Sequence, residues 1–155
     1  MTIERATLLD AEEILSLQKL AYRSEAEIYN DFSIPPLLQT LAEIRKDFEN
    51  QVVLKTVRGG KIVGSVRAFF REGTCYIGRL IVHPDFQNQG IGKELMSGSE
   101  ETFKEARRFE LFTGPKSEKN LHPYEKLGYR VFKTVKANER LTIVFLEKIK
   151  LSKEG

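Results

Sequence analysis

A glycine-bearing segment at positions 87–92, which reads Q-N-Q-G-I-G, constrains the fold of this chain more than any other feature. The apolar run at 75–82 before it predicts a buried strand, and the pattern at 91–108 after it predicts a helix. A strand that passes through glycines into a helix brings main-chain N–H groups and the positive end of the helix dipole together. Because glycine has no Cβ, a ligand can approach this backbone closely. The segment therefore predicts a cradle for a phosphate group.

The context of this segment distinguishes it from two commoner phosphate-binding loops. The chain has no G-x-x-x-x-G-K-[ST] motif, which argues against a P-loop. No G-x-G-x-x-G follows its first predicted strand, which argues against a dinucleotide-binding fold. A second distinctive run, P-Y-E-K-L-G-Y, occupies positions 123–129. The two segments together support a ligand site more strongly than either does alone.

The two segments resemble the signatures of a known enzyme family. The run I-G-R-L-I-V-H-P-D-F-Q-N-Q-G-I-G-K-E-L-M is similar to the acetyl-CoA signature of the GNAT family of N-acetyltransferases, and Y-E-K-L-G-Y is similar to the family's second signature. The motifs cover residues 75–108 and 117–132, whereas the N-terminal third matches the family only in its pattern of elements. The resemblance implies an N-acetyltransferase that moves acetyl from acetyl-CoA to an amine by direct attack in a ternary complex. A non-catalytic acyl-CoA-binding or sensing module is the alternative.

The apolar periodicity and the turn residues predict one domain over residues 1–155, of the α/β (α+β) class. A mixed, mainly antiparallel sheet of about seven strands is expected, flanked by about four helices in the order βααβββαβαββ. The predicted strands are 2–6, 52–57, 62–70, 75–82, 109–113, 129–135 and 141–148. The predicted helices are one that Asp10 caps with Glu13 in a capping box, 37–48, 91–108, and a short one that Ser117 or Asn120 caps and Gly128 ends. The pattern leaves open whether residues 22–32 extend the first helix or break it.

The resemblance also implies how the coenzyme lies on the chain. The pantetheine arm runs beside the strand that ends at Val82, like an added strand, and the diphosphate lies over the N–H groups of residues 87–92. The implied coenzyme-binding residues are Leu80, Ile81, Val82, Gln87, Asn88, Gln89, Gly90, Ile91, Gly92, Lys93, Asn120 and Tyr124. Gly78 is an isolated glycine in a strand pattern and predicts a bulge or a close backbone approach. In the family the strand bulges here and splays from its parallel neighbour, and a main-chain N–H near Leu80 or Ile81 holds the thioester oxygen.

Tyr124 is the predicted catalytic residue. The family's tyrosine matches it through the Y-E-K-L-G-Y setting, and a positioned phenol can act as a general acid that protonates the departing thiolate. A core aromatic packed with Leu127 and Phe132 is the alternative. Asn120 lies on the same helical face four residues earlier, but many relatives carry their asparagine where this chain has Ser117. Asn120 is therefore either a coenzyme contact or a helix cap.

The general base has no single candidate in the sequence. Some relatives present a glutamate at the strand position that Tyr76 occupies here, and its absence favours the non-catalytic alternative. Glu72 on the preceding turn is the candidate substitute, and Glu110 or a water molecule stays open. Each carboxylate also fits an ordinary surface charge. The implied acceptor wall, residues 22–40, is acidic and aromatic, which suits an amine or simply an amphipathic helix.

Composition argues against several other classes of protein. The formal charge of +3 is small, and basic residues are interspersed with acidic ones, so we expect no nucleic-acid partner. No apolar run reaches the length of a membrane span and the first residues do not read as a signal peptide, so we expect a cytoplasmic protein without a membrane partner. Two histidines and one cysteine, Cys75, make a poor metal site and allow no internal disulfide. The expected partners are acetyl-CoA, a small-molecule or peptide amine, no metal and, by family resemblance, a second copy in a homodimer.

Overall fold

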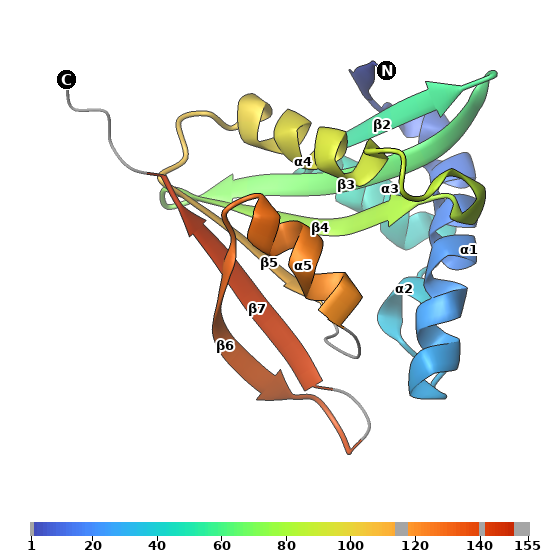
Figure 1. The fold of residues 1–155 in the computed structure, drawn as a ribbon. Helices are drawn as coiled ribbons and strands as arrows, with labels where there is room; N and C mark the ends of the chain where they lie inside the picture. The colour runs from blue at the N-terminus through green and yellow to red at the C-terminus, as the bar shows by residue number, and fades with distance from the viewer. Residues whose placement is uncertain (1, 114–117, 140–141, 151–155) are drawn as a thin grey trace.

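Seven strands form one sheet in the part of the chain that the computed structural model describes, residues 2–113, 118–139 and 142–150. The strands are β1 (Ile3–Arg5), β2 (Val52–Arg58), β3 (Lys61–Arg71), β4 (Thr74–Val82), β5 (Arg108–Thr113), β6 (Arg130–Lys136) and β7 (Thr142–Ile149). Their order across the sheet is β1-β2-β3-β4-β5-β7-β6 (Figure 1). The pair β4–β5 is parallel and the other pairs are antiparallel. The predicted mixed, mainly antiparallel sheet is confirmed.

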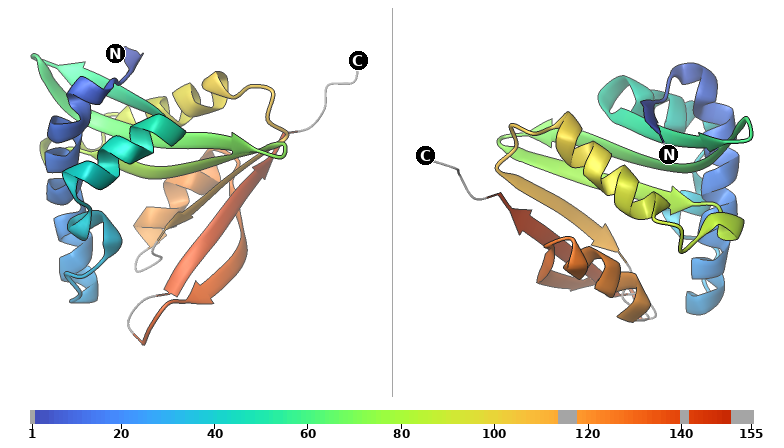
Figure 2. Two further views of the ribbon diagram at one scale, coloured as in Figure 1. Left: turned by 180° about the vertical axis from the view of Figure 1, so that it is seen from behind. Right: turned by 45° about the horizontal axis from the view of Figure 1, so that its top comes forward.

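Helices cover both faces of this sheet (Figure 2). They are α1 (Ala11–Tyr29), α2 (Pro35–Leu38), α3 (Leu41–Asn50), α4 (Ile91–Thr102) and α5 (Glu118–Lys126), with single 3-10 turns at η1 (Leu8–Asp10) and η2 (Pro84–Phe86). Apolar side chains of α1 and α3 pack on one face around Ile14, Ile44 and Ile81. Those of α4 pack on the other face around Leu95 and Met96, together with α5. Burial of apolar surface on both faces joins the layers to the sheet.

The start of α1 differs from its prediction. Asp10 occupies the N-cap position directly before α1, as expected, but its φ of −88° and ψ of −6° are helical and its side chain makes no capping hydrogen bond to the helix. Its carboxylate instead accepts the Thr7 N–H at 2.9 Å and pairs with Lys55 Nζ at 2.9 Å. Glu13, the predicted partner in the capping box, accepts the Ile62 N–H at 2.8 Å. That bond joins α1 to the beginning of β3.

The segment between α1 and β2 contains two helices where one was predicted. α1 runs through the region that the pattern left open and ends at Asn30, whose φ of 52° is left-handed. Residues 37–48, predicted as one helix, are divided between α2 and α3. At Thr40 the side chain accepts the Glu43 N–H at 3.1 Å, and the Thr40 N–H donates to the Glu43 carboxylate at 2.9 Å. This capping box starts a new helix, and the sequence T-L-A-E was its signal.

α4 is shorter than its predicted range of 91–108. It ends at Thr102, and Phe103 leaves the helical region with φ −114° and ψ 48°. The Ala106 N–H then donates to the Phe103 carbonyl at 2.9 Å in a turn that leads into β5. Ala106 is itself buried in the core, so the apolar pattern continued through this turn without helical structure.

The parallel pair β4–β5 opens along its length. Its register runs from Thr74 opposite Arg108 to Tyr76 opposite Glu110. Both strands continue past this point without pairing to each other in the described residues. One edge of β4 therefore has no strand partner over residues 77–82.

A β-bulge in β4 accompanies this opening. On the β3 side Arg67 faces Gly78 and Ser65 faces Ile81, so two residues of β4 oppose one residue of β3. Arg79 is one of these two residues, and its φ of 50° lies in the left-handed region. The bulge predicted at Gly78 is confirmed, although Arg79 rather than the glycine has the unusual backbone conformation.

Candidate active site

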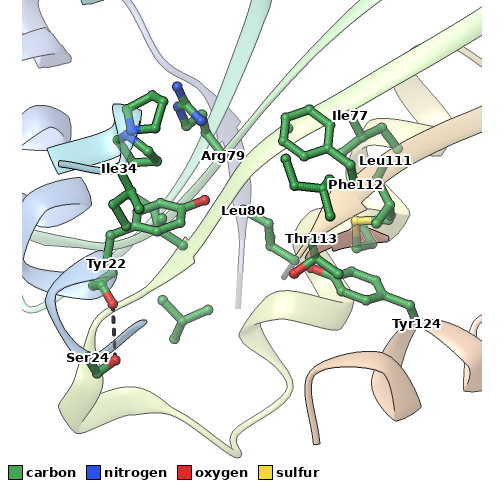
Figure 3. A pocket seen from close by; sticks show the side chains of 18 of the residues that line it. Tyr22, Ser24, Ile34, Ile77, Arg79, Leu80, Leu111, Phe112, Thr113 and Tyr124 are labelled. Carbon is green, nitrogen blue, oxygen red and sulfur yellow. Dashed lines mark hydrogen bonds between the residues drawn. The ribbon is translucent and has the colours of Figure 1, made fainter. Parts of the chain in front are cut away.

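A cavity of about 430 Å³ lies where β4 and β5 diverge (Figure 3). Its walls come from residues 77–82 of β4, the end of β5, the second half of α1 and the start of α2. The lining also includes Met96 of α4, Gln87 of the loop before α4, Tyr124 of α5 and Ile143 of β7. Because α4 and α5 lie on the opposite face of the sheet from α1 and α2, the cavity connects the two faces between the strands.

The loop before α4 leaves main-chain N–H groups open to a ligand. Gly90 precedes the helix with a left-handed φ of 82°, and Asn88 is also left-handed at 63°. The first bond of the helix joins the Glu94 N–H to the Gly90 carbonyl at 3.0 Å, so the N–H groups of residues 91–93 have no acceptor within the helix. A Cβ built on Gly90 would meet no atom within 4 Å, so the space beside it is open. Such a helix N-terminus favours an anion such as a phosphate.

Neighbouring contacts hold this loop in place. The side chain of Ile91, the first residue of α4, is 1% exposed and packs in the core between α4 and the sheet. Only its main chain is therefore available to a ligand. Gln89 Oε1 accepts a hydrogen bond from Arg58 Nη1 of β2 at 2.7 Å. His83 Nδ1 accepts the Asp85 N–H at 3.1 Å and caps the 3-10 turn at the entry to the loop. The loop is therefore anchored both to the sheet and to the helix that follows it.

The free edge of β4 leads from this loop into the cavity. The side chains of Leu80 and Val82 point toward the head of α4, since a Cβ built on Gly92 would lie 3.9 Å from each of them. Their main-chain groups border the stretch of β4 that has no partner strand. An extended ligand that begins at the loop can add to this edge as an extra strand.

Tyr124 reaches from α5 into the cavity beside Thr113 of β5 (Figure 3). Its ring is partly buried and meets the Tyr129 ring edge to face, with 6.5 Å between centroids. Leu127, one predicted packing partner, joins Tyr124 at the edge of the core, whereas Phe132 packs against the Phe145 ring at 6.3 Å. Tyr124 is thus both a wall of the cavity and part of the core margin.

The remaining predicted coenzyme contacts lie in the loop, in α4 and in α5. Gln87 lines the cavity, and Lys93 is exposed in the first turn of α4. Asn120 falls in α5, four residues before Tyr124, but its side chain lies outside the described residues, as does Ser117. Their contacts with a ligand stay predictions.

The candidate base, Glu72, lies far from the cavity. It occupies the exposed turn between β3 and β4, with φ 49°, at the opposite end of β4 from the bulge. An extended chain places it about 26 Å from Leu80, at roughly 3.3 Å per residue. Glu110, the second candidate, pairs with Arg108 Nη1 at 2.7 Å and does not line the cavity. Neither carboxylate therefore has direct access to an amine in the cavity. Glu72 lies at the far end of β4, and Glu110 is paired with Arg108 outside the lining.

The α1–α2 side of the cavity, where an acidic acceptor wall was expected, carries a different charge. The described residues that line the cavity include Tyr22 and Ser24 of α1, but no aspartate, glutamate or histidine. Asp31, from the predicted acidic wall, accepts the Ser33 N–H at 2.9 Å instead. The charged residue among the described lining is Arg79 (Figure 3). The sequence did not predict this position, because a strand arginine is ordinarily solvated and no local pattern marked the left-handed conformation of Arg79.

Arg67 supports this side of the cavity from within the structure. Its side chain is 2% exposed; Nη1 donates to Asp47 Oδ2 at 2.9 Å and Nη2 donates to Gln18. Gln18 Nε2 in turn donates to the Pro36 carbonyl at 2.9 Å. Burial lowers the pKa of Arg67 to about 10; Asp47 opposes this shift and Arg79 adds to it. A buried charge must be paired, and the groups that pair with Arg67 join α1, α2 and α3 to β3. In the sequence, an arginine within an apolar strand pattern was the feature that could have indicated this network.

Cys75 is a core residue rather than a nucleophile. It is 0% exposed, and burial, followed by the charges of Glu100 and Glu105, raises the pKa of its thiol to about 12. The thiol therefore stays protonated at neutral pH. Within residues 2–113, 118–139 and 142–150, no three His, Cys, Asp or Glu side chains gather as metal ligands would. No helix in these same ranges combines the length and the apolar character needed to cross a membrane.

Comparison with known proteins agrees with this geometry. A model of the acetyltransferase (GNAT) family matches residues 11–129. Among curated proteins, the UPF0157 protein YqkA of Bacillus subtilis (strain 168) is 29% identical over 133 residues, which cover 86% of this chain and 38% of that protein. The chain thus spans less than half the length of this relative.

Solved structures share the fold over nearly the whole chain. The ribosomal-protein-S18-alanine N-acetyltransferase of Escherichia coli is 15% identical with a TM-score of 0.80, and the match covers 99% of this chain and 97% of that one. The PaiA N-acetyltransferase of Thermoplasma acidophilum, solved in complex with coenzyme A, is 17% identical with a TM-score of 0.68, covering 96% and 99%. These likenesses show a common fold, and the family model extends over most of the sequence. The chain therefore belongs to the acetyltransferase (GNAT) family.

Proposed function

We propose that this protein transfers the acetyl group of acetyl-CoA to an amine by direct attack within a ternary complex. The observation that carries the proposal is the cavity at the divergence of β4 and β5, which connects the loop on the α4 face with the α1–α2 face. A coenzyme entering from one face and an amine entering from the other would meet beside the bulge. Holding both reactants in place removes much of the entropic barrier of a bimolecular reaction.

The residues around the loop fit a coenzyme of this type. Its diphosphate would accept hydrogen bonds from the N–H groups of residues 91–93, and Gly90 leaves the space beside them open. Its pantetheine arm would extend along residues 77–82, where Leu80 and Val82 offer main-chain groups. The coenzyme supplies the thioester, and the chain supplies its position.

Two parts of the cavity wall suit acyl transfer. Main-chain N–H groups at the bulge near Leu80 would stabilise the oxyanion that forms on the thioester; one such donor is typically worth about 10²–10³ in kcat. Tyr124, which reaches into the cavity from α5, would protonate the departing sulfur. Because the described lining has no carboxylate or imidazole, we assign removal of the amine's proton to water.

Two measurements test the proposal. At 100 times its Kd, acetyl-CoA should stabilise the folded protein by about 2.7 kcal/mol. For a domain of this size that corresponds to a rise in Tm of roughly 5–11 °C. Release of free thiol from acetyl-CoA in the presence of a panel of amines then measures the reaction.

The outcomes separate the two functions under consideration. No change in Tm at millimolar acetyl-CoA would refute both. A clear rise in Tm without thiol release from any amine would favour the acyl-CoA-binding or sensing module, which the lack of a carboxylate in the described lining also suits. A rise in Tm together with amine-dependent thiol release would support the transferase.

A further inference from the structure

Arg79 brings a positive charge to the acceptor side of the cavity. It is the left-handed residue of the bulge in β4, with φ 50°, and Figure 3 shows its side chain beside Ile34. The same residue also borders a second hollow formed by α2 and α3. A bulge re-aims the side chains of its strand, which explains how an arginine in β4 comes to face this space.

The Arg79 side chain has an unused hydrogen-bond donor. Its Nε is buried and makes no hydrogen bond in the described structure, and Arg79 takes part in none of the ion pairs found there. Two carboxylates border the same hollow: Asp47 pairs with Arg67 at 2.9 Å, and Glu43 accepts the Thr40 N–H at 2.9 Å. Buried donors are ordinarily hydrogen-bonded. An orphaned guanidinium nitrogen at a cavity wall therefore points to an acceptor that a ligand supplies.

Arg79 and the phosphate-binding loop lie on opposite faces of the sheet. Ile81 packs in the core beneath α1 and α3, whereas Leu80 and Val82 pack in the core beneath α4. Arg79 shares the face of Ile81, since the second hollow that it borders is built from α2 and α3. The diphosphate of a coenzyme bound at the head of α4 is therefore not its partner. The partner belongs to the molecule that enters from the α1–α2 face.

We propose that the acceptor is an amine that also carries a carboxylate or phosphate group, and that Arg79 binds this group; the inference rests on the proposed transferase function. A guanidinium binds either oxyanion through two parallel N–H···O bonds, which fix the orientation of the ligand. A simple cationic amine would meet a like charge at this wall. An amino acid or an amino phosphate instead turns its acid group to Arg79 and its nitrogen toward the opening between β4 and β5.

Matched pairs of amines test this inference by thiol release at saturating acetyl-CoA. Each common α-amino acid is compared with its own primary amide, and O-phosphoethanolamine with ethanolamine, so that each pair differs in the acid group. The amino amide is the less basic amine, which favours the neutral member and so biases the comparison against the inference. We expect kcat/KM for at least one acid-bearing member to exceed that of its neutral partner by at least tenfold. Carboxylate and phosphate are distinguished by which pair shows the difference.

Variants assign the preference to Arg79. Arg79→Gln should lower kcat/KM for the preferred acid-bearing amine at least tenfold more than it lowers kcat/KM for the neutral partner. Arg79→Lys retains the positive charge but cannot form the two parallel N–H···O bonds of a guanidinium. The decrease in kcat/KM for the acid-bearing amine should therefore be intermediate. Arg71→Gln removes an exposed arginine of β3 that does not line the cavity, and it should behave as wild type. The rise in Tm caused by acetyl-CoA is measured on every variant to establish that it folds and binds the coenzyme.

The outcomes keep this inference separate from the proposed function. A preference that disappears in Arg79→Gln while acetyl-CoA still raises Tm supports the inference. Equal kcat/KM within every pair, or a preference that Arg79→Gln leaves intact, overturns it and leaves the transferase proposal standing. Should Arg79→Gln fail to fold, an unreduced preference in Arg79→Lys overturns the inference and a reduced one supports it. An absence of thiol release from every amine, or of any rise in Tm, defeats both proposals.

Discussion

Gly64 provides a direct test of how the sheet positions the glycine-bearing loop before α4. It lies in β3 beneath α4, and a Cβ built on it would lie 2.7 Å from Ile91 Cγ2 and 3.0 Å from Leu95 Cδ1. Both neighbours are buried, and the Cγ2 of isoleucine is attached to the branched Cβ, so it cannot swing aside freely. Gly64→Ala must therefore push α4 away from the sheet. Because Ile91 is the first residue of α4, the N–H groups of the loop would move with it.

The expected magnitude follows from this overlap. Overpacking a close-packed core costs about 1–3 kcal/mol in the free energy of unfolding. For a domain of this size, that loss lowers Tm by roughly 2–12 °C. Gly64→Ala should also reduce the rise in Tm that acetyl-CoA produces, because the displaced loop binds the diphosphate less well.

Urea unfolding of a double-mutant cycle measures the contact itself. Ile91→Ala alone should cost about 2–5 kcal/mol through the cavity that it leaves. With Gly64→Ala added, the new methyl group enters that space, so the double variant should lose at least about 1 kcal/mol less than the sum of the single losses. Additive losses, or a Gly64→Ala protein as stable as wild type, would refute the reasoning that a methyl group at position 64 overlaps Ile91.

Three further predictions concern single residues. Tyr124→Phe should lower kcat while the rise in Tm with acetyl-CoA stays the same, because the phenol acts on the leaving sulfur; unchanged turnover would remove Tyr124 from the mechanism. Gly90→Val should weaken coenzyme binding at least tenfold, since its side chain would enter the space beside the loop. Gly59→Val is its matched control in the β2–β3 turn, with φ 57° and equally open surroundings, and comparable affinities in the two variants would show that the loop does not hold the coenzyme. The thiol of Cys75 should resist a thiol reagent at pH 8 until the protein unfolds, because burial keeps it covered and raises its pKa to about 12; rapid labelling of the folded protein would contradict this. Since the unfolded thiol ionises near pH 8.5, the folded state binds more protons above that pH, and the contribution of Cys75 to stability should fall from about pH 8.5 toward pH 12.

Short-range patterns were sufficient for the strands, the helix that starts at Ile91 and the glycine-bearing loop. The conformation of a glycine and the start of a helix depend on a few neighbouring residues, so both can be predicted from the local sequence. The capping box of Thr40 and Glu43 was equally local, and the division of the predicted helix at 37–48 could have been read from it. The difference at Asp10 is local as well, since its carboxylate caps the 3-10 turn at Thr7 instead of α1.

The charge of the cavity wall depended on long-range contacts that no local pattern records. Glu72 and Arg79 are only seven positions apart, yet the turn places Glu72 in solvent and the bulge places Arg79 at the cavity. Arg67 is matched by Asp47, which is 20 positions away, and by Gln18, which is 49 positions away. The sequence alone identified the family and predicted a phosphate-binding loop through residues that are neighbours in the chain. Which charged groups line the cavity followed from how helices pack on the sheet, because apolar burial brings those distant segments together.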